Sequence, residues 1–378
     1  MLPFPITRAE VSRSRLVGNF QYLRSLLPDI AEEAGNGKRL GELAAASELL
    51  AVVKANAYGN GLSLCAPWLV EAGARWLGVT SAEEGVAARQ LCPDATILVM
   101  RGLLAGEADA LLEARLVPTV WNSTHLDLLA GATRQRMAAA GSVPLHLEID
   151  TGMSRQGVGL RALPMFLDAL RKVPALHLAG VSTHFASAEM LDAEQNRQQG
   201  SAFRQALEHI YTAGFRPQWI HAGNSSTLLA RQFEALCGIG KTWGARFLLR
   251  PGIALYGYAP AFSGADIEAA EQARARLQPV LSWRTSIVST QTVEVGAAVG
   301  YDATFIARAS MRLGLLPVGY ADGLNRKLSG SNSSPGGLVL VRGVRAPIVG
   351  RVSMDLTVVD LSQIPNAATG DEVVILGE

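Results

Sequence analysis

The 378-residue chain has few cysteines, no long uncharged apolar run and almost no net charge. Its three cysteines, Cys65, Cys92 and Cys237, are far apart, so they match neither a disulfide framework nor a metal site. No run of about 18 uncharged apolar residues occurs, which excludes a membrane-spanning helix. The formal charge of +1 gives no electrostatic reason to expect nucleic acid or an anionic membrane as a partner.

The amino-terminal segment MLPFPITRAEVSRSR lacks the apolar stretch and cleavage site of a signal peptide. With so few cysteines, the sequence predicts a cytoplasmic protein. Hydrophobic residues make up 49% of the chain, and its length suits two domains.

Short apolar runs alternate with helical patterns through the first two-thirds of the chain. Continuous apolar strands with helices between them predict a parallel sheet covered by helices. Eight such units predict an α/β fold closed into a (β/α)8 barrel. Periodicity does not show closure, so a doubly wound open sheet stays an alternative. The predicted strands are 49–53, 76–79, 96–100, 117–120, 145–149, 176–182, 218–221 and 247–255.

Beyond residue 260 the pattern changes to short strand-like runs separated by turn sequences, which predicts a mainly β domain. We therefore divide the chain into a barrel of residues 1–260 and a β domain of residues 261–378. Residues 30–47 are expected to form an extended helix and loop before the first barrel strand. The runs of the β domain are 281–288, 311–318, 338–341, 347–352, 357–361 and 373–376.

Lys54 directly follows the first predicted barrel strand, in the segment AVVKANAYGNG. Barrel enzymes carry their catalytic groups at this carboxyl-terminal mouth. Desolvation there lowers a lysine pKa, so that the amine can form a Schiff base. Position alone leaves a rim lysine that extends into solvent as an equal alternative.

The loops after the seventh and eighth strands, HAGNSS and RPGIALYG, have the composition of a phosphate site. Barrels commonly bind phosphate there through backbone N–H groups and a helix N-terminus. Ser225 or Ser226 would cap the next helix, and the same hydroxyl would bind phosphate. A phosphorylated aldehyde cofactor would explain these loops and a reactive Lys54 together, whereas ordinary helix caps would explain the serines alone.

Other polar residues follow the strands or lie in the β domain, and each alone has a plainer structural explanation. Taken in order with Lys54, however, they resemble the alanine racemase family over nearly the whole chain. The segment around Lys54 is similar to that family's pyridoxal-phosphate attachment pattern. The residues that carry the resemblance are Lys54, Arg155, His184, Ser225, Arg250, Tyr301, Tyr320 and Met354.

The resemblance implies an isomerase that converts L-alanine and D-alanine into one another and supplies D-alanine for peptidoglycan. Lys54 would hold pyridoxal 5'-phosphate as an internal aldimine and then move the α-proton on one face. Tyr301, from the other subunit of a homodimer, would act on the opposite face, since racemisation needs a base on each. His184 and Arg250 would lie beside that tyrosine and help it to act as a base.

Arg250 also implies how the cofactor is tuned, through the ring nitrogen. An arginine is always charged and only donates, so it disfavours a protonated ring and suppresses transamination. The resemblance further places Arg155 at the ring phenolate and the substrate, Met354 at the substrate carboxylate, and His221 and Tyr320 in supporting positions. No residue is assigned to a metal. The phosphate would be surrounded by Tyr58, Asn224, Ser225, Gly252 and Ile253.

Two features depart from the family pattern. Where many members carry a carbamylated lysine, this chain has Glu148, and we predict that its carboxylate orients Arg155 by a charge-assisted hydrogen bond. The chain also stops at Glu378, before a further phosphate-contacting tyrosine of the family. We expect either a fragment or a protein that holds phosphate less tightly.

Three alternatives remain open at this stage. The first is another or broad-specificity racemase, for serine or lysine. The second is a non-catalytic pyridoxal-phosphate-binding barrel, against which the β domain and Tyr301 argue. The third is a barrel decarboxylase, whose acidic cysteine loop and glycine-rich phosphate loops we do not find.

Overall fold

The fold is taken from a computed structural model that describes residues 6–27, 47–232 and 242–377. It divides into a barrel unit, Arg13–Gln278, and a β unit, Met1–Ser12 with Pro279–Glu378. This differs from the predicted division at residue 260. The amino-terminal strand β1 (Arg8–Val11) belongs to the β unit, because it pairs antiparallel with β11 (Leu281–Ser286). Helix α11 (Glu268–Ala275) stays with the barrel unit.

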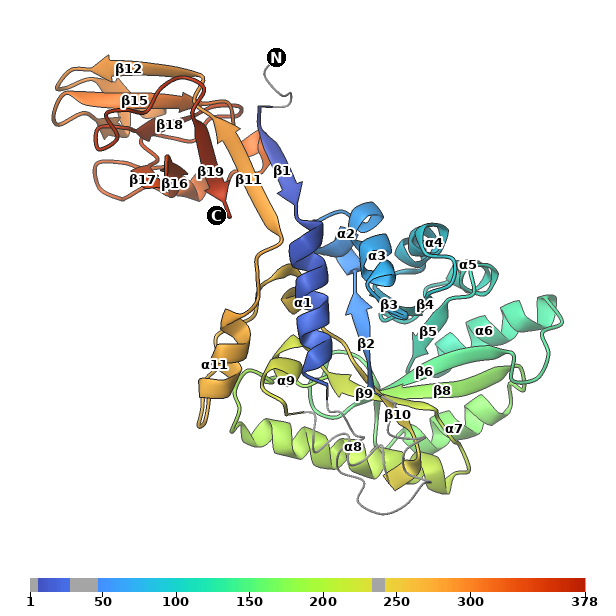
Figure 1. The fold of residues 1–378 in the computed structure, drawn as a ribbon. Helices are drawn as coiled ribbons and strands as arrows, with labels where there is room; N and C mark the ends of the chain where they lie inside the picture. Colours follow the sequence, from blue (N-terminus) through green and yellow to red (C-terminus); the bar gives the residue numbers. More distant parts are fainter. Residues whose placement is uncertain (1–5, 28–46, 233–241, 378) are drawn as a thin grey trace. The chain divides into compact units, whose positions relative to one another are not determined.

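Eight parallel strands close on themselves in the barrel unit (Figure 1). The pairings of β10 with β2 and of β5 with β6 complete the ring. The predicted barrel is confirmed, and the open sheet is excluded. A two-residue strand, β7 (Val158–Gly159), adds to β6. The barrel strands are β2 (Ser47–Val52), β3 (Trp76–Val79), β4 (Thr96–Val99), β5 (Val117–Val120), β6 (Val143–Asp150), β8 (Leu176–Ser182), β9 (Trp219–Gly223) and β10 (Arg246–Leu249).

Helices surround these strands (Figure 1). In α7 (Leu163–Arg171) the buried residues Leu163, Phe166, Leu167 and Leu170 recur every three or four positions. Inside the ring, alternate strand residues such as Leu50, Trp76 and Trp219 pack into one cluster. The other helices of the described residues are α1 (Arg13–Ser25), α3 (Leu62–Glu71), α4 (Ala82–Leu91), α5 (Glu107–Glu113), α6 (Ser123–Gln135), α8 (Glu194–Thr212) and α9 (Ser225–Leu229), besides the short left-handed segment labelled α2 (Lys54–Tyr58).

The predicted strand 247–255 was too long. Strand β10 ends at Leu249, and Ile253–Tyr256 forms a short 3-10 helix, η1. Pro251 ends the ladder because it has no N–H to donate, and its carbonyl accepts from Val52 N at 3.0 Å. Most of the predicted segment 30–47 lies outside the described residues.

The β unit contains a five-stranded sheet, a three-stranded sheet and a two-stranded pair. The predicted strand 347–352 was wrong, because β17 precedes it and pairs with β16 through a two-residue turn. That turn, Arg342-Gly343, has positive φ at both residues, as tight hairpins require. The remaining strands are β12 (Ser289–Val293), β13 (Ala298–Val299), β14 (Phe305–Ile306), β15 (Met311–Leu316), β16 (Leu338–Val341), β17 (Val344–Pro347), β18 (Thr357–Asp360) and β19 (Glu372–Leu376).

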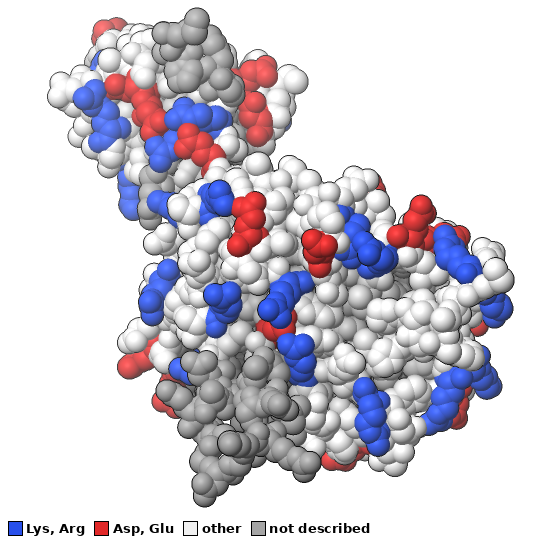
Figure 2. Space-filling view, turned by 45° about the vertical axis from the view of Figure 1, so that its right-hand side comes forward, with Lys and Arg blue, Asp and Glu red and all other residues white. Residues whose placement is uncertain are grey.

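Basic and acidic side chains are interspersed over the face shown in Figure 2, without a continuous field of one sign. Among the described residues, no helix combines the length and hydropathy needed to cross a bilayer.

Candidate active site

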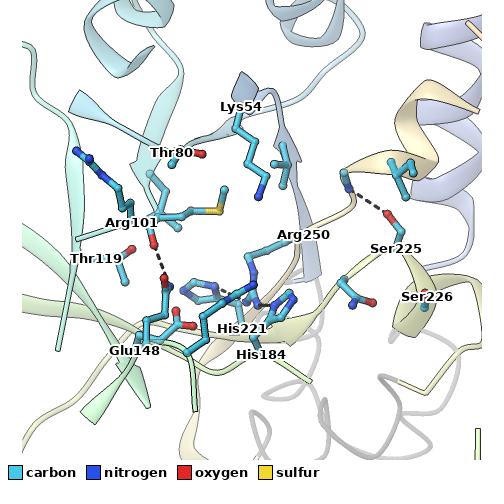
Figure 3. A pocket seen from close by; sticks show the side chains of 18 of the residues that line it. Lys54, Thr80, Arg101, Thr119, Glu148, His184, His221, Ser225, Ser226 and Arg250 are labelled. Atoms are coloured by element: carbon cyan, nitrogen blue, oxygen red, sulfur yellow. Dashed lines mark hydrogen bonds between the residues drawn. The ribbon is translucent and has the colours of Figure 1, made fainter. Parts of the chain in front are cut away.

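A cavity of about 460 Å³ opens at the carboxyl ends of the barrel strands. Every one of the eight strands contributes to its lining, either from its last residues or from the loop that follows (Figure 3). The lining residue from each strand in turn is Lys54, Thr80, Arg101, Thr119, Glu148, His184, His221 and Arg250.

Lys54 follows β2 and extends into this cavity towards Arg250 (Figure 3). Burial lowers the pKa of its amine, and the positive charges of Arg155 and Arg250 lower it further, while Glu84 opposes them. A lowered pKa increases the neutral fraction of the amine, the form that acts as nucleophile or base.

The four residues after Lys54, from Ala55 to Tyr58, form a left-handed turn with φ between 53° and 56°. None is glycine, and such backbone costs about 1–2 kcal/mol per residue. Local hydrogen bonds hold the turn: Gly59 N donates to Ala55 O at 3.0 Å, and Leu62 N donates to Asn56 Oδ1 at 2.8 Å. The direction in which Lys54 leaves the strand is therefore built into a strained, well-supported turn.

Ser225 joins the loops after β9 and β10. Its Oγ accepts hydrogen bonds from Gly252 N at 3.0 Å and from Ala254 N at 3.2 Å. The prediction that a serine caps α9 was wrong, because Asn224 is the cap and accepts from Thr227 N at 3.1 Å. The Ser225 hydroxyl proton is thus left to donate to a ligand.

Tyr58 lies against the same loop, and Gly252 makes this possible. A Cβ at position 252 would lie 2.1 Å from the Tyr58 hydroxyl oxygen. The Tyr58 ring packs on the buried Tyr256, with 4.9 Å between centroids, and Tyr256 donates to Val52 O at 3.1 Å. Burial raises the pKa of Tyr58, so its hydroxyl stays a proton donor.

Arg250 is buried and contacts two histidines. Its guanidinium donates to Nδ1 of His221 at 2.8 Å, to Nδ1 of His184 at 3.2 Å and to Thr183 O at 2.8 Å. These bonds use the terminal nitrogens, and Nε–H has no partner among the described residues. Burial, helped by the Arg250 charge, lowers the pKa of His184 to about 3 and that of His221 well below 6.5. Both histidines are therefore neutral at pH 7.

The predicted hydrogen bond between Glu148 and Arg155 was wrong. Neither a hydrogen bond nor an ion pair joins these two side chains in the part of the chain that the structure describes, because Glu148 is buried in β6 whereas Arg155 is exposed. Ser182 Oγ instead donates to Glu148 Oε2 at 2.8 Å. Burial lowers the pKa of Arg250, and the negative charge of Glu148 opposes this lowering.

The predicted residues of the β unit lie on neighbouring loops. Tyr320 N donates to Ser353 O at 3.0 Å, which places Tyr320 beside the segment that carries Met354. Tyr301 is 67% exposed and Met354 is 55% exposed, so both side chains are available to a ligand or to another chain.

Several residues that line the cavity or support its lining residues were not predicted. His146 lies two residues before Glu148 on β6, and the two-residue period of a strand puts both on one face. Glu84 belongs to a Ser81-x-x-Glu84 capping pattern, which gave a second signal. No sequence pattern distinguished other lining residues, such as Thr80, Met100, Arg101, Thr119, Gln156 and Glu189.

The donor set of the cavity fits a phosphorylated anion. The positive charges of Arg155 and Arg250 lower the pKa of Lys54, and that of Arg155 also lowers the pKa of Arg250, so an anion among the three side chains would relieve their repulsion. The Ser225 hydroxyl and the backbone of Gly252 form a small cradle for a phosphate, and a side chain at position 252 would fill that space. No three His, Cys, Asp or Glu side chains are grouped as a metal site within residues 6–27, 47–232 and 242–377.

Comparisons with known proteins agree along both units. Residues 29–260 match the model of the alanine racemase N-terminal domain, and residues 280–378 match that of the alanine racemase C-terminal domain. Alanine racemase of Syntrophobacter fumaroxidans is 36% identical over 353 residues, covering 92% of this chain and 86% of the relative. Alanine racemase of Sorangium cellulosum is 35% identical over 98% of this chain and 88% of the relative.

Solved structures show the same likeness. Alanine racemase from Streptomyces lavendulae has a TM-score of 0.82 and 30% identity, covering 98% of this chain and 87% of that one. The biosynthetic alanine racemase from Pseudomonas aeruginosa has a TM-score of 0.76 and 30% identity, covering 98% and 90%. Since both domain models match in order and relatives align over most of its length, the chain belongs to the alanine racemase family.

Proposed function

We propose that this protein racemises alanine with pyridoxal 5'-phosphate as cofactor, and that Lys54 and Tyr301 are its two bases. The observation that carries the proposal is the position of Lys54. Its amine has a lowered pKa and shares one cavity with a phosphate cradle and with Arg250. A Schiff-base lysine and a phosphate site are the two requirements of this cofactor.

The cofactor, when bound, withdraws electrons from the substrate Cα and so makes the α-proton acidic. The free Nε–H of Arg250 is suited to donate to the ring nitrogen, and its fixed charge opposes protonation of that nitrogen. Arg155, exposed in the cavity, is suited to the ring phenolate and the substrate carboxylate. The phosphate would be held by Tyr58, Asn224, Ser225, Gly252 and Ile253.

Inversion at Cα requires a proton donor on one face and an acceptor on the other. Lys54 would serve one face. Tyr301 would serve the other, reaching the cavity from the second subunit of a homodimer together with Met354. The high exposure of Tyr301 in the β unit supports this arrangement.

We place the protein in the cytoplasm, where D-alanine would enter peptidoglycan synthesis. Its few cysteines support this location, since Cys65 and Cys92 are buried free thiols.

Chiral analysis after incubation with L-alanine, L-serine and L-lysine tests the proposal. We expect D-alanine to accumulate faster than D-serine or D-lysine, and Lys54→Ala to abolish its formation. D-serine or D-lysine as the main product would assign another racemase. If the protein binds the cofactor but forms no D-amino acid, it is a pyridoxal-phosphate-binding protein and not a racemase.

A further inference from the structure

Glu84, in the first turn of α4, bridges the ends of two barrel strands. Its Oε1 accepts a hydrogen bond from Ala55 N at 2.6 Å, and its Oε2 accepts one from Thr80 N at 2.8 Å. Ala55 directly follows Lys54 after β2, and Thr80 directly follows β3. One carboxylate therefore holds the two strand ends that flank the lysine.

We propose that Glu84 is the positioning residue of Lys54, holding the turn that aims the amine at the cofactor. The inference rests on the proposed function of Lys54 as cofactor ligand and base. It extends that function from the cavity lining to a helix outside the barrel wall.

The left-handed turn gives this carboxylate its importance. Ala55 is the first residue of the turn with positive φ, and its N–H is the donor that Glu84 engages. One backbone bond, from Ala57 N to Val53 O at 2.9 Å, spans Lys54, and the donors of the other bonds lie further along the chain, at Gly59, Asn60, Gly61 and Leu62. Glu84 thus adds a side-chain bond at the end nearest Lys54, where a rotation of the backbone would move the amine most.

Helix capping alone does not account for these contacts. In a capping box, a glutamate at this position bonds the N–H of the capping residue, here Ser81. Glu84 instead bonds Thr80, the residue before the cap, and Ala55, in the turn that follows the neighbouring strand β2. Ser81 caps the helix by itself, because its hydroxyl accepts from Glu84 N at 3.2 Å.

Glu84 also supplies negative charge to the lysine. Three charged residues affect the Lys54 amine: Arg155 and Arg250 lower its pKa, and Glu84 raises it. Glu84 is the acidic member of this group, so its loss would leave the amine facing positive charge alone. Position and charge are thus two separable contributions of one side chain.

The test compares holoenzymes of wild type, Glu84→Gln, Glu84→Asp and the control Glu83→Gln. Glu83 is an exposed neighbour in the same first turn. Hydrogen exchange of the peptides that contain Ala55 and Thr80 reports the two bonds without turnover. The pH profile of kcat reports the charge on the Lys54 amine, which is free only once substrate has displaced it from the cofactor.

We expect Glu84→Gln to speed exchange in both peptides about tenfold, since an amide offers one acceptor where the carboxylate offers two. Its kcat should fall about tenfold or more with little change in KM, and the acid limb of its profile should move to lower pH. Glu84→Asp should bring that limb back while exchange stays fast, because a shorter carboxylate keeps the charge but not both bonds.

Exchange and pH profile in Glu84→Gln equal to those of Glu83→Gln would overturn the inference. A loss of overall thermal stability with normal exchange at Ala55 would do the same, since it would indicate a merely structural role. If the wild type racemises no amino acid, the proposed function fails, while the exchange comparison still decides whether Glu84 holds the turn.

Discussion

Arg250 donates a 2.8 Å hydrogen bond to Nδ1 of His221. This bond determines which ring nitrogens carry a proton in a buried series of hydrogen-bonded histidines. Because Nδ1 of His221 accepts, its proton is on Nε2, which lies 2.8 Å from Nδ1 of His146. His146 then carries its proton on Nε2, which is buried without a partner in the described residues. No ring nitrogen of His221 or His146 is therefore free to accept a further proton.

Acid should therefore destabilise the barrel through these histidines. Burial lowers the pKa of His146 to about 3, against 6.5 for the unperturbed side chain. The unfolded state binds a proton that the folded state excludes, so stability is full above pH 6.5 and falls as the pH drops towards 3. The slope is about 1.4 kcal/mol per pH unit for each such histidine.

Urea denaturation at pH 7, 6 and 5 checks this prediction. His146→Gln should flatten the pH dependence, because glutamine does not titrate. The control is His209→Gln, at an exposed histidine of α8, which should retain the wild-type slope. Equal slopes in all three proteins would show that His146 does not contribute to the pH dependence of the free energy of unfolding.

Gly252→Ala should weaken cofactor binding. The new Cβ would lie 2.1 Å from the Tyr58 hydroxyl, so the tyrosine must leave the phosphate cradle. Such overpacking costs about 1–3 kcal/mol, or roughly tenfold or more in affinity. Titration of the dialysed protein with pyridoxal phosphate measures it. Gly200→Ala, where a Cβ meets open space, should bind normally, and adding Tyr58→Phe to Gly252→Ala should recover part of the affinity.

Arg250→Glu should change the products as well as the rate. A carboxylate would stabilise a protonated ring nitrogen and so favour protonation away from Cα, which would release pyruvate from L-alanine and leave its amino group on the cofactor, one pyruvate for each cofactor bound. Arg250→Lys keeps the charge but loses the contacts with His184, His221 and Thr183, so it should be slower, by about tenfold or more, yet form no pyruvate. An enzymatic pyruvate assay beside chiral analysis separates the two. Pyruvate from both variants would contradict this role of Arg250.

Much of the site was predictable because parallel strands end at one mouth. Lys54, His184 and Arg250 each follow an apolar run, so their meeting in one cavity follows from the order of strands and the closure of the barrel. The eight runs were long and apolar enough to read without the structure.

The local geometry was not predictable. Alanine favours a right-handed helix, yet Ala55 and Ala57 are left-handed, because hydrogen bonds from outside the segment override propensity. The bonds from Gly252 to Ser225 and from Ala55 to Glu84 join residues 27 and 29 positions apart. The expected contact of Glu148 with Arg155 failed because spacing along a loop does not determine where a side chain points.

The central claim is that two bases act on opposite faces of Cα, and Tyr301→Phe in deuterated water tests it most directly. Racemisation should fall about 100-fold or more, since phenylalanine carries no proton to transfer. The α-hydrogen of one enantiomer should still exchange with solvent, because Lys54 keeps its face. Racemisation at the wild-type rate in Tyr301→Phe would contradict the account.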